Sequence, residues 1–159
     1  MEKPLISVVT VAYNAVATIE QTILSVINQT YPNIEYIIID GGSTDGTVNI
    51  IKKYMDHIAY WVSEPDKGIY DAMNKGGIRA TGTFIQFLNA GDWLENEYVV
   101  EKIFKKNPKN VDVIYGDMII RRSDGIYYAK AQDLSHFKCD FPLFHPSTFI
   151  SKSIFISCL

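Results

Sequence analysis

The sequence predicts one α/β domain over residues 1–159, a three-layer fold with a mixed, mainly parallel sheet and a small antiparallel addition. Short apolar runs alternate along the chain with segments whose apolar residues recur at helical spacing. The early runs are apolar on both faces, as is typical of parallel strands covered on both sides. An Asp-Gly pair between two later runs is a strong hairpin signal, and it predicts the antiparallel part.

The first half of the chain is predicted to alternate strands and helices. Residues 5–12 are rich in β-branched side chains and form the first expected strand. Residues 18–30 have helical apolar spacing, with Thr18 as N-cap and Gln21 at the capping-box position. The further elements expected here are a strand at 34–39, a helix at 48–55, a strand at 58–62, a helix at 69–79 and a strand at 84–88. This alternation implies parallel strands joined by right-handed crossovers.

The second half is predicted to add the antiparallel strands. The elements expected here are a helix at 95–106, a strand at 111–115, a hairpin at 118–122 and 126–130, and a short strand at 147–150. Residues 132–146 have the composition of a loop with buried aromatic side chains. The apolar segment 151–159 reads as an element cut short that needs a partner surface.

Composition limits the kinds of partner and compartment. The net charge of −3 and the lack of a dense Lys/Arg run argue against nucleic-acid binding as the main task. Cys139 and Cys158 form neither a disulfide framework nor a metal-ligand spacing, so a reducing, cytoplasmic compartment is expected. No signal-peptide pattern and no apolar run of transmembrane length is present. Association with the inner face of the membrane and formation of a homodimer both stay open.

Acidic residues follow several expected strands at what should be one edge of the sheet: Asp40, Asp66, Asp92 and Asp117. That edge is where α/β sheets bind ligands. Carboxylates gathered there would repel one another unless a cation lay between them, and a divalent metal can hold a diphosphate. Each Asp could instead be a turn or cap residue, and for Asp92 alone the two readings are evenly balanced.

Common nucleotide-binding loops are absent from the sequence. There is no Gly-x-x-x-x-Gly-Lys-Ser/Thr segment, and no Gly-x-Gly-x-x-Gly follows the first strand. The ATPase and dinucleotide readings are therefore disfavoured. A diphosphate held by a metal is the remaining way in which an acidic site would bind a nucleotide.

Motifs along nearly the whole chain resemble those of family 2 glycosyltransferases, including a bacterial subset, and they lie at 7–14, 39–47, 64–76, 88–92 and 145–149. The resemblance implies a GT-A fold, with a Rossmann-like nucleotide-sugar half at 1–116 and the start of an acceptor half at 117–159. It also implies inverting transfer from a nucleotide-sugar, most often UDP-linked, with Mg²⁺ or Mn²⁺. The acceptor would be a glycan or a lipid-linked molecule in cell-surface polysaccharide assembly.

The resemblance also assigns roles to residues, and it places the donor in a pocket formed by Thr10, Ala12, Asn14, Asp40, Asp66, Lys67 and Asn89. Asp40 is expected to contact the base or ribose, and Asp66 to lie near the uracil with Lys67 beside it. Asp92 matches the last acid of the family's Asp-x-Asp-like motif and is expected to reach the metal. A metal there would neutralise the charge that develops on the departing diphosphate.

Three departures from the family pattern matter for function. Only Asp92 is acidic in the metal motif, and Gly41 stands where the family often has a second Asp. The family's general base usually follows the His-containing segment, and this chain ends before such an acid, so Asp117 is the alternative base. His145 is expected to pack or to belong to the acceptor loop. A donor-binding module without turnover, and a purely structural or partner domain, are the competing hypotheses.

Overall fold

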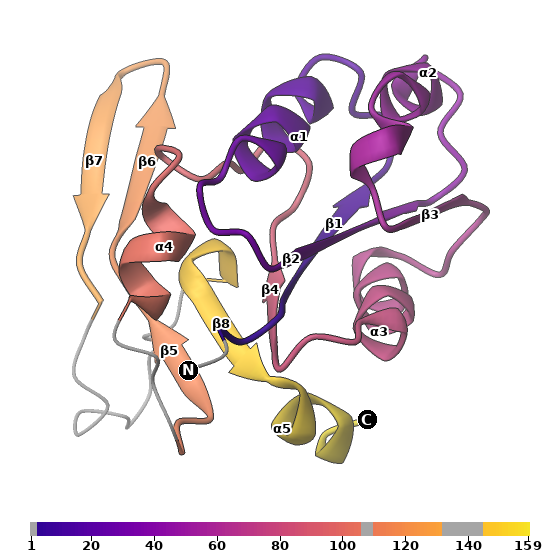
Figure 1. Ribbon diagram of the computed structural model, residues 1–159. Helices are drawn as coiled ribbons and strands as arrows, with labels where there is room; N and C mark the ends of the chain where they lie inside the picture. The colour runs from indigo at the N-terminus through magenta and orange to yellow at the C-terminus, as the bar shows by residue number, and fades with distance from the viewer. Residues whose placement is uncertain (1–2, 106–109, 132–144) are drawn as a thin grey trace.

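A six-stranded sheet lies at the centre of the computed structural model, which describes residues 3–105, 110–131 and 145–159 (Figure 1). Its strand order is β3-β2-β1-β4-β8-β5. These strands are β1 (Ile6–Ala12), β2 (Ile34–Asp40), β3 (Tyr60–Ser63), β4 (Phe84–Phe87), β5 (Val113–Tyr115) and β8 (Thr148–Ser151). The first four pair in parallel, whereas β8 runs antiparallel between β4 and β5. The predicted mixed, mainly parallel sheet is therefore confirmed.

Helices cover both faces of this sheet and complete the three layers. The helices on one face are α1 (Ile19–Ile27), α2 (Thr47–Lys53) and α4 (Val99–Phe104), and those on the other are α3 (Ile69–Arg79) and α5 (Lys152–Ser157) (Figure 1). Two short 3₁₀ helices, η1 (Met55–His57) and η3 (His145–Ser147), precede β3 and β8.

The central strand β1 shows why its sequence is apolar on both faces. Ile6 and Val8 pack into the core beneath α1, while Val9 and Val11 belong to the core beneath α3. All seven residues of the strand are buried. Alternate side chains of a strand point to opposite faces, so a strand covered on both sides needs a continuous run of buried residues.

The predicted hairpin forms a separate two-stranded sheet of β6 (Met118–Arg122) and β7 (Gly125–Ala129). Arg122 pairs with Gly125, so Ser123 and Asp124 alone form the turn. Arg121 forms an ion pair of 2.9 Å with Glu95, which ties the hairpin to the segment before α4. The antiparallel addition is confirmed.

Three predicted features near helix ends differ from the structure in detail. The helix expected from residue 95 begins only at Val99, because the Asn96 side chain accepts a hydrogen bond from the Tyr98 N–H in a turn (3.0 Å). Thr18 occupies the N-cap position of α1, but its side chain makes no cap hydrogen bond. Within the segment 151–159, residues 152–157 form α5, and Phe155 of this helix packs on Phe87 with ring centroids 5.5 Å apart.

The loop predicted at 132–146 falls mostly outside the described residues, and so does Cys139. Within the described ranges, no helix has both the length and the apolar character needed to cross a membrane.

Candidate functional site

Strand direction brings the predicted acidic residues to one edge of the sheet. The carboxyl ends of β2, β3, β4 and β5 share that edge, because β8 is antiparallel to both β4 and β5. Asp40 is the last residue of β2, and Asp66, Asp92 and Asp117 follow β3, β4 and β5. No three His, Cys, Asp or Glu side chains among residues 3–105, 110–131 and 145–159 gather closely enough to hold a metal ion. The acids share an edge but are spread along it.

The loop after β1 is braced against the loop after β2. The Asn14 N–H donates to the Ser43 hydroxyl (2.8 Å), and the Asn14 side-chain oxygen accepts from the Thr44 N–H (3.0 Å). The Val16 N–H donates to the Asp45 carboxylate (3.0 Å). Asn14 has a φ of +47°, in the left-handed region that Asn tolerates better than most residues. Asn14 therefore shapes the surface where a nucleotide is predicted to bind.

Thr47 strengthens the same contact from the start of α2. Its hydroxyl accepts from the Ala15 N–H (2.8 Å) and donates to Asp45 (2.6 Å). The pKa of Asp45 is lowered, chiefly by the Thr47 hydroxyl and further by the backbone N–H groups of Val16 and Thr47. The carboxylate is thus held in the charged form that joins the two loops.

Asp40 is turned into the protein. Its side chain is fully buried, and its carboxylate accepts hydrogen bonds from the Gly42 N–H (3.2 Å), the Ser43 N–H (2.9 Å) and the Ser43 hydroxyl (2.5 Å). The Ser63 hydroxyl donates a fourth bond from the end of β3 (2.6 Å). In this structure Asp40 organises the loop that would face a nucleotide, and its carboxylate is directed at its own loop.

Thr10 and Ala12 lie in the second half of β1. Both are buried, and Thr10 shares a hydrogen bond of 3.0 Å with the Tyr36 hydroxyl. The alternation of β1 turns their side chains into the core beneath α1 and α2. That Thr10 and Ala12 line the nucleotide pocket stays a prediction, and with these side chains buried the contact would come from the backbone. The Ala12 carbonyl does hold the neighbouring loop, since it accepts from the Gly41 N–H (2.8 Å).

Gly41, Asp66 and Tyr13 meet beside this loop. A Cβ added at Gly41 would lie 2.5 Å from Asp66 Oδ2 and 3.3 Å from Tyr13 Cδ2. The other Asp66 oxygen accepts from the Gly68 N–H (2.8 Å), which orients the carboxylate. Glycine at position 41 thus leaves the room that Asp66 occupies. The exposed Tyr13 ring can stack on a base, and the neighbouring Asp66 carboxylate can accept hydrogen bonds from that base. Tyr13 was not among the predicted site residues.

The turn after β4 presents oxygen atoms at the same edge. Asn89 Oδ1 is buried and has no hydrogen-bond partner among the described residues. Gly91 has a φ of +110°, which residues with a side chain rarely adopt, and the Asp92 N–H closes the turn on the Asn89 carbonyl (2.9 Å). A buried oxygen without a partner is costly and indicates a ligand, an ion or a water. Carboxylate and amide oxygens are the donors that Mg²⁺ and Mn²⁺ prefer.

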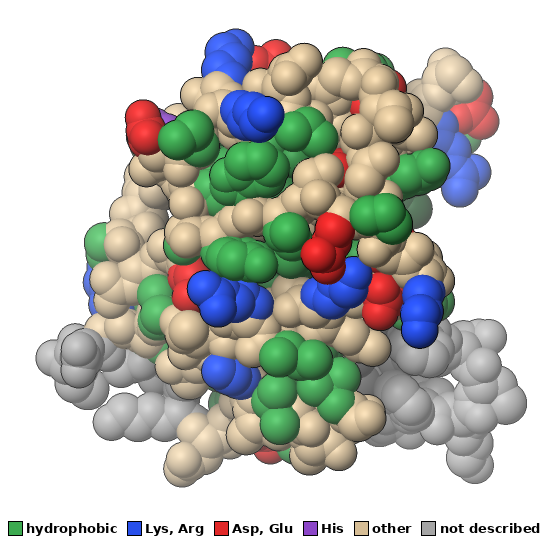
Figure 2. Space-filling view, turned by 90° about the vertical axis from the view of Figure 1, so that its right-hand side faces the viewer, with side chains coloured by type: hydrophobic (Ala, Val, Ile, Leu, Met, Phe, Trp, Pro, Cys, Tyr) green, Lys and Arg blue, Asp and Glu red, His purple; other side chains and the backbone are tan. Residues whose placement is uncertain are grey.

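Positive charge near Asp66 comes from the turn before α3 and from α3 itself. Lys75 is bound by Glu64 (2.9 Å) and Asp71 (3.4 Å), and its pKa is raised chiefly by the hydrogen bond with Glu64. Lys67 is exposed, and its N–H donates to Asp71 (3.1 Å). Figure 2 views this side of the molecule and shows basic and acidic side chains intermixed.

Asp117 lies at the base of the hairpin. It is exposed, and its carboxylate accepts a hydrogen bond from the Ala131 N–H (2.9 Å). The acceptor-side motif is close to it in the fold, because the Ser147 hydroxyl donates to the Gly116 carbonyl (2.9 Å) and the Gly116 N–H donates to the Ser147 carbonyl (3.1 Å). The side chain of His145 lies outside the described part of the structure.

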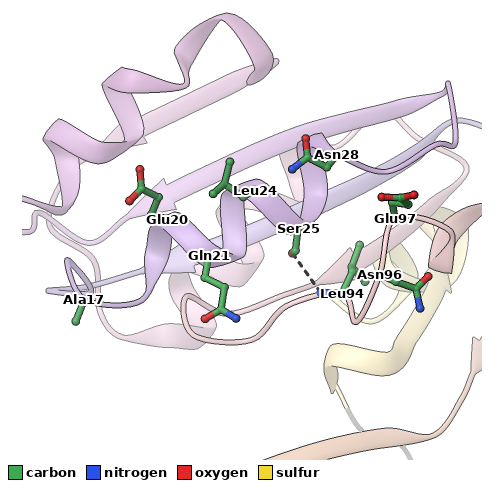
Figure 3. A pocket seen from close by; sticks show the side chains of 9 residues that line it. All are labelled: Ala17, Glu20, Gln21, Leu24, Ser25, Asn28, Leu94, Asn96 and Glu97. Atoms are coloured by element: carbon green, nitrogen blue, oxygen red, sulfur yellow. Dashed lines mark hydrogen bonds between the residues drawn. The ribbon is translucent and has the colours of Figure 1, made fainter.

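A surface hollow of about 550 Å³ lies away from these residues, between α1 and the segment before α4 (Figure 3). Its lining residues are Ala17, Glu20, Gln21, Leu24, Ser25, Asn28, Leu94, Asn96 and Glu97. The predicted site residues are not among them. The hollow is therefore not part of the candidate site.

The mixed sheet, with helices on both faces and a polar carboxyl edge, places the chain among three-layer α/β domains, which bind ligands at that edge. Residues 7–158 match the model of Glycosyl transferase family 2, and the chain belongs to that family. It is 30% identical over 160 residues to a "PGL/p-HBAD biosynthesis glycosyltransferase" of Mycobacterium bovis, covering 98% of this chain and 62% of the relative. The chain therefore spans less than two thirds of the length of that relative.

Solved structures share the fold at low sequence identity. Staphylococcus aureus TarS 1-349 in complex with UDP-GlcNAc has a TM-score of 0.74 and 19% identity, and the match covers 97% of this chain and 47% of that one. The mannosyltransferase PcManGT from Pyrobaculum calidifontis in complex with GDP-Man and Mn²⁺ has a TM-score of 0.65 and 18% identity, over 89% and 48% of the two chains. The predicted GT-A fold is confirmed.

Proposed function

We propose that this chain binds a nucleotide-sugar and, in the whole protein, transfers its sugar to an acceptor hydroxyl. The supporting observation is the turn after β4, where the unpartnered Asn89 oxygen lies three residues before Asp92 at the carboxyl edge. The complexes of TarS with UDP-GlcNAc and of PcManGT with GDP-Man support a nucleotide-sugar donor. The UDP-linked type is our proposal for this chain.

The base would lie on the surface formed by Tyr13 and Asp66. The exposed Tyr13 ring offers a stacking face, and Asp66 offers acceptor oxygens for the N–H group of a uracil. Lys67 adds positive charge next to Asp66. Asn14 and Asp40 act through the loops that they brace, since each is hydrogen-bonded within the polypeptide.

Mg²⁺ or Mn²⁺ would bind at Asp92 and the Asn89 side-chain oxygen. The residues fit such an ion, because Mg²⁺ is commonly held by one or two carboxylates together with substrate phosphates. The Mn²⁺ in the PcManGT complex supports this proposal. A bound ion supplies positive charge where the leaving diphosphate becomes negative. Asp92 and Asn89 fix the place at which that diphosphate is held.

Transfer with inversion requires a base that takes the proton of the acceptor hydroxyl, and we propose Asp117 for this role. Residues 1–116 would then form the donor half and 117–159 the start of the acceptor half. For the whole protein we propose a glycan or lipid-linked acceptor in polysaccharide assembly, reached from the cytoplasmic face of the membrane. The name of the mycobacterial relative supports a biosynthetic role.

Donor binding without turnover is the second candidate function. The hydrogen bond from the Ala131 N–H favours it, because one Asp117 oxygen is already occupied by the backbone at the base of the hairpin. The match covers 62% of the mycobacterial relative. The catalytic base of the whole protein would then lie outside residues 1–159.

Calorimetry with UDP and an assay of UDP release from UDP-sugars, both with and without Mn²⁺, test the two candidates. Asp92→Asn should abolish the Mn²⁺-dependent part of UDP binding and leave the melting temperature nearly unchanged. Asp124→Asn, at the exposed hairpin turn, is the matched control. UDP binding without release would favour the module, and a lack of UDP binding at millimolar concentration would refute both.

A further inference from the structure

Thr22 holds the turn that carries Asp92. It is fully buried on α1, and its hydroxyl accepts a hydrogen bond from the Gly91 N–H (3.0 Å) while donating to the Asp92 carbonyl (2.8 Å). One side chain therefore satisfies backbone groups on both sides of the Gly91–Asp92 peptide bond. Together with the turn closure on the Asn89 carbonyl, this fixes the backbone from which the Asp92 carboxylate projects.

The same face of α1 continues the contact along the chain. The Ser25 hydroxyl accepts from the Leu94 N–H (3.2 Å), which Figure 3 shows as a dashed line. The Gln29 side chain donates to the Asn96 carbonyl (2.7 Å) and accepts from the Val100 N–H (3.1 Å). Within the described ranges, residues 93–98 pair with no strand before α4 begins, so Ser25 on α1 and Gln29 just after it satisfy several backbone groups there. The turn after β4 is thus fastened to a rigid helix.

We propose that Thr22 is a positioning residue for Asp92, an inference that rests on the proposed function. Thr22 acts through the Gly91–Asp92 backbone, since its hydroxyl is occupied there. A carboxylate that is already oriented does not have to be ordered when the metal and diphosphate arrive. Residues that orient metal ligands typically change metal affinity by about 10- to 100-fold when they are mutated.

The test compares Thr22→Val, which keeps the shape but removes both hydrogen bonds, with Thr22→Ser, which keeps the hydroxyl. Thr30→Val is the matched control, because the Thr30 hydroxyl, in the loop after α1, also bonds the segment around α4, at the Glu97 carbonyl (3.2 Å) and the Glu101 carboxylate (2.8 Å). Calorimetry measures UDP affinity with and without Mn²⁺, and hydrogen exchange measures protection of the Gly91 amide.

In Thr22→Val, the Gly91 amide should lose its protection from hydrogen exchange. The factor by which Mn²⁺ raises UDP affinity should fall about tenfold, while UDP affinity without metal stays at the wild-type value. Thr22→Ser should restore both, and Thr30→Val should change neither. The inference is overturned if Gly91 protection falls while the Mn²⁺-dependent gain stays intact, or if metal-free affinity falls equally. If the wild-type protein does not bind UDP, the proposed function is refuted. If it binds UDP but Mn²⁺ does not raise the affinity, the metal site is refuted. In either case the role of Thr22 in binding is refuted as well.

Discussion

Replacing Asp40 with alanine should destabilise the fold, because this carboxylate is an internal hydrogen-bond acceptor. It is fully buried and accepts bonds from Gly42, from Ser43 twice and from Ser63. A net hydrogen bond to a charged group is worth about 1.5–3 kcal/mol, but bonds in one network are not additive. Removing the carboxylate leaves buried N–H and O–H donors without an acceptor, at about 1–3 kcal/mol for each donor that stays unsatisfied, so we expect a total loss of about 3–5 kcal/mol.

For a chain of this length, each kcal/mol lowers the melting temperature by about 2–4 °C, so Asp40→Ala should melt about 6–20 °C lower. Scanning calorimetry and urea unfolding measure this directly, and UDP affinity should fall with and without Mn²⁺ because the loop loses its brace. Asp66→Ala is the control at the same edge and should lose UDP affinity with little change in melting temperature. An Asp40→Ala protein that melts like wild type but no longer binds UDP would refute the internal role and restore the direct nucleoside contact that the family resemblance implies.

Two further substitutions test the site and the stability of the fold. Gly41→Ala should weaken UDP binding several-fold with little change in melting temperature, because the new methyl group would displace the movable Asp66 carboxylate. Glu35→Gln should lose less stability than wild type when the pH falls from about 5 to about 3. Burial raises the pKa of Glu35, but hydrogen bonds from Ser7 and Thr81 outweigh this and lower it below its ordinary 4.5. The carboxylate therefore stabilises the fold fully above that ordinary pKa, and this stabilisation is lost as the pH falls through the lowered value.

Matched variants make both results interpretable. Gly116→Ala adds a methyl group where no atom of the described residues lies within 4 Å, so UDP binding should be unchanged. Glu97→Gln removes an exposed carboxylate and should follow the wild-type pH curve. A Gly41→Ala protein with wild-type UDP affinity would show that the position of Asp66 does not matter for binding. Equal acid sensitivity of Glu35→Gln and wild type would remove Glu35 from the acid response.

The parallel half of the sheet could be predicted from the sequence. Runs that are apolar on both faces indicate buried strands, and the alternation of strands with amphipathic helices indicates that these strands run in parallel. The hairpin followed from the Asp-Gly pair that joins its strands. The place of β8 could not be predicted, since its insertion between β4 and β5 depends on pairing between residues about 65 and 35 positions apart in the chain. The start of α4 was missed because the Asn96 side chain competes for a backbone N–H group in the preceding turn.

The site shows a second limit of prediction from sequence, because an Asp at the end of a buried strand has two different structural surroundings in this protein. Asp40 ends β2 and Asp92 follows β4 at the same edge, yet only Asp40 is fully buried. After Asp40, the chain turns back so that its own N–H groups and Ser43 reach the carboxylate. After Asp92, the Thr22 hydroxyl binds the backbone carbonyl and draws the chain along α1. The contacts of the following backbone therefore differ at the two acids: the adjoining loop supplies them after Asp40, and a helix distant in sequence supplies them after Asp92.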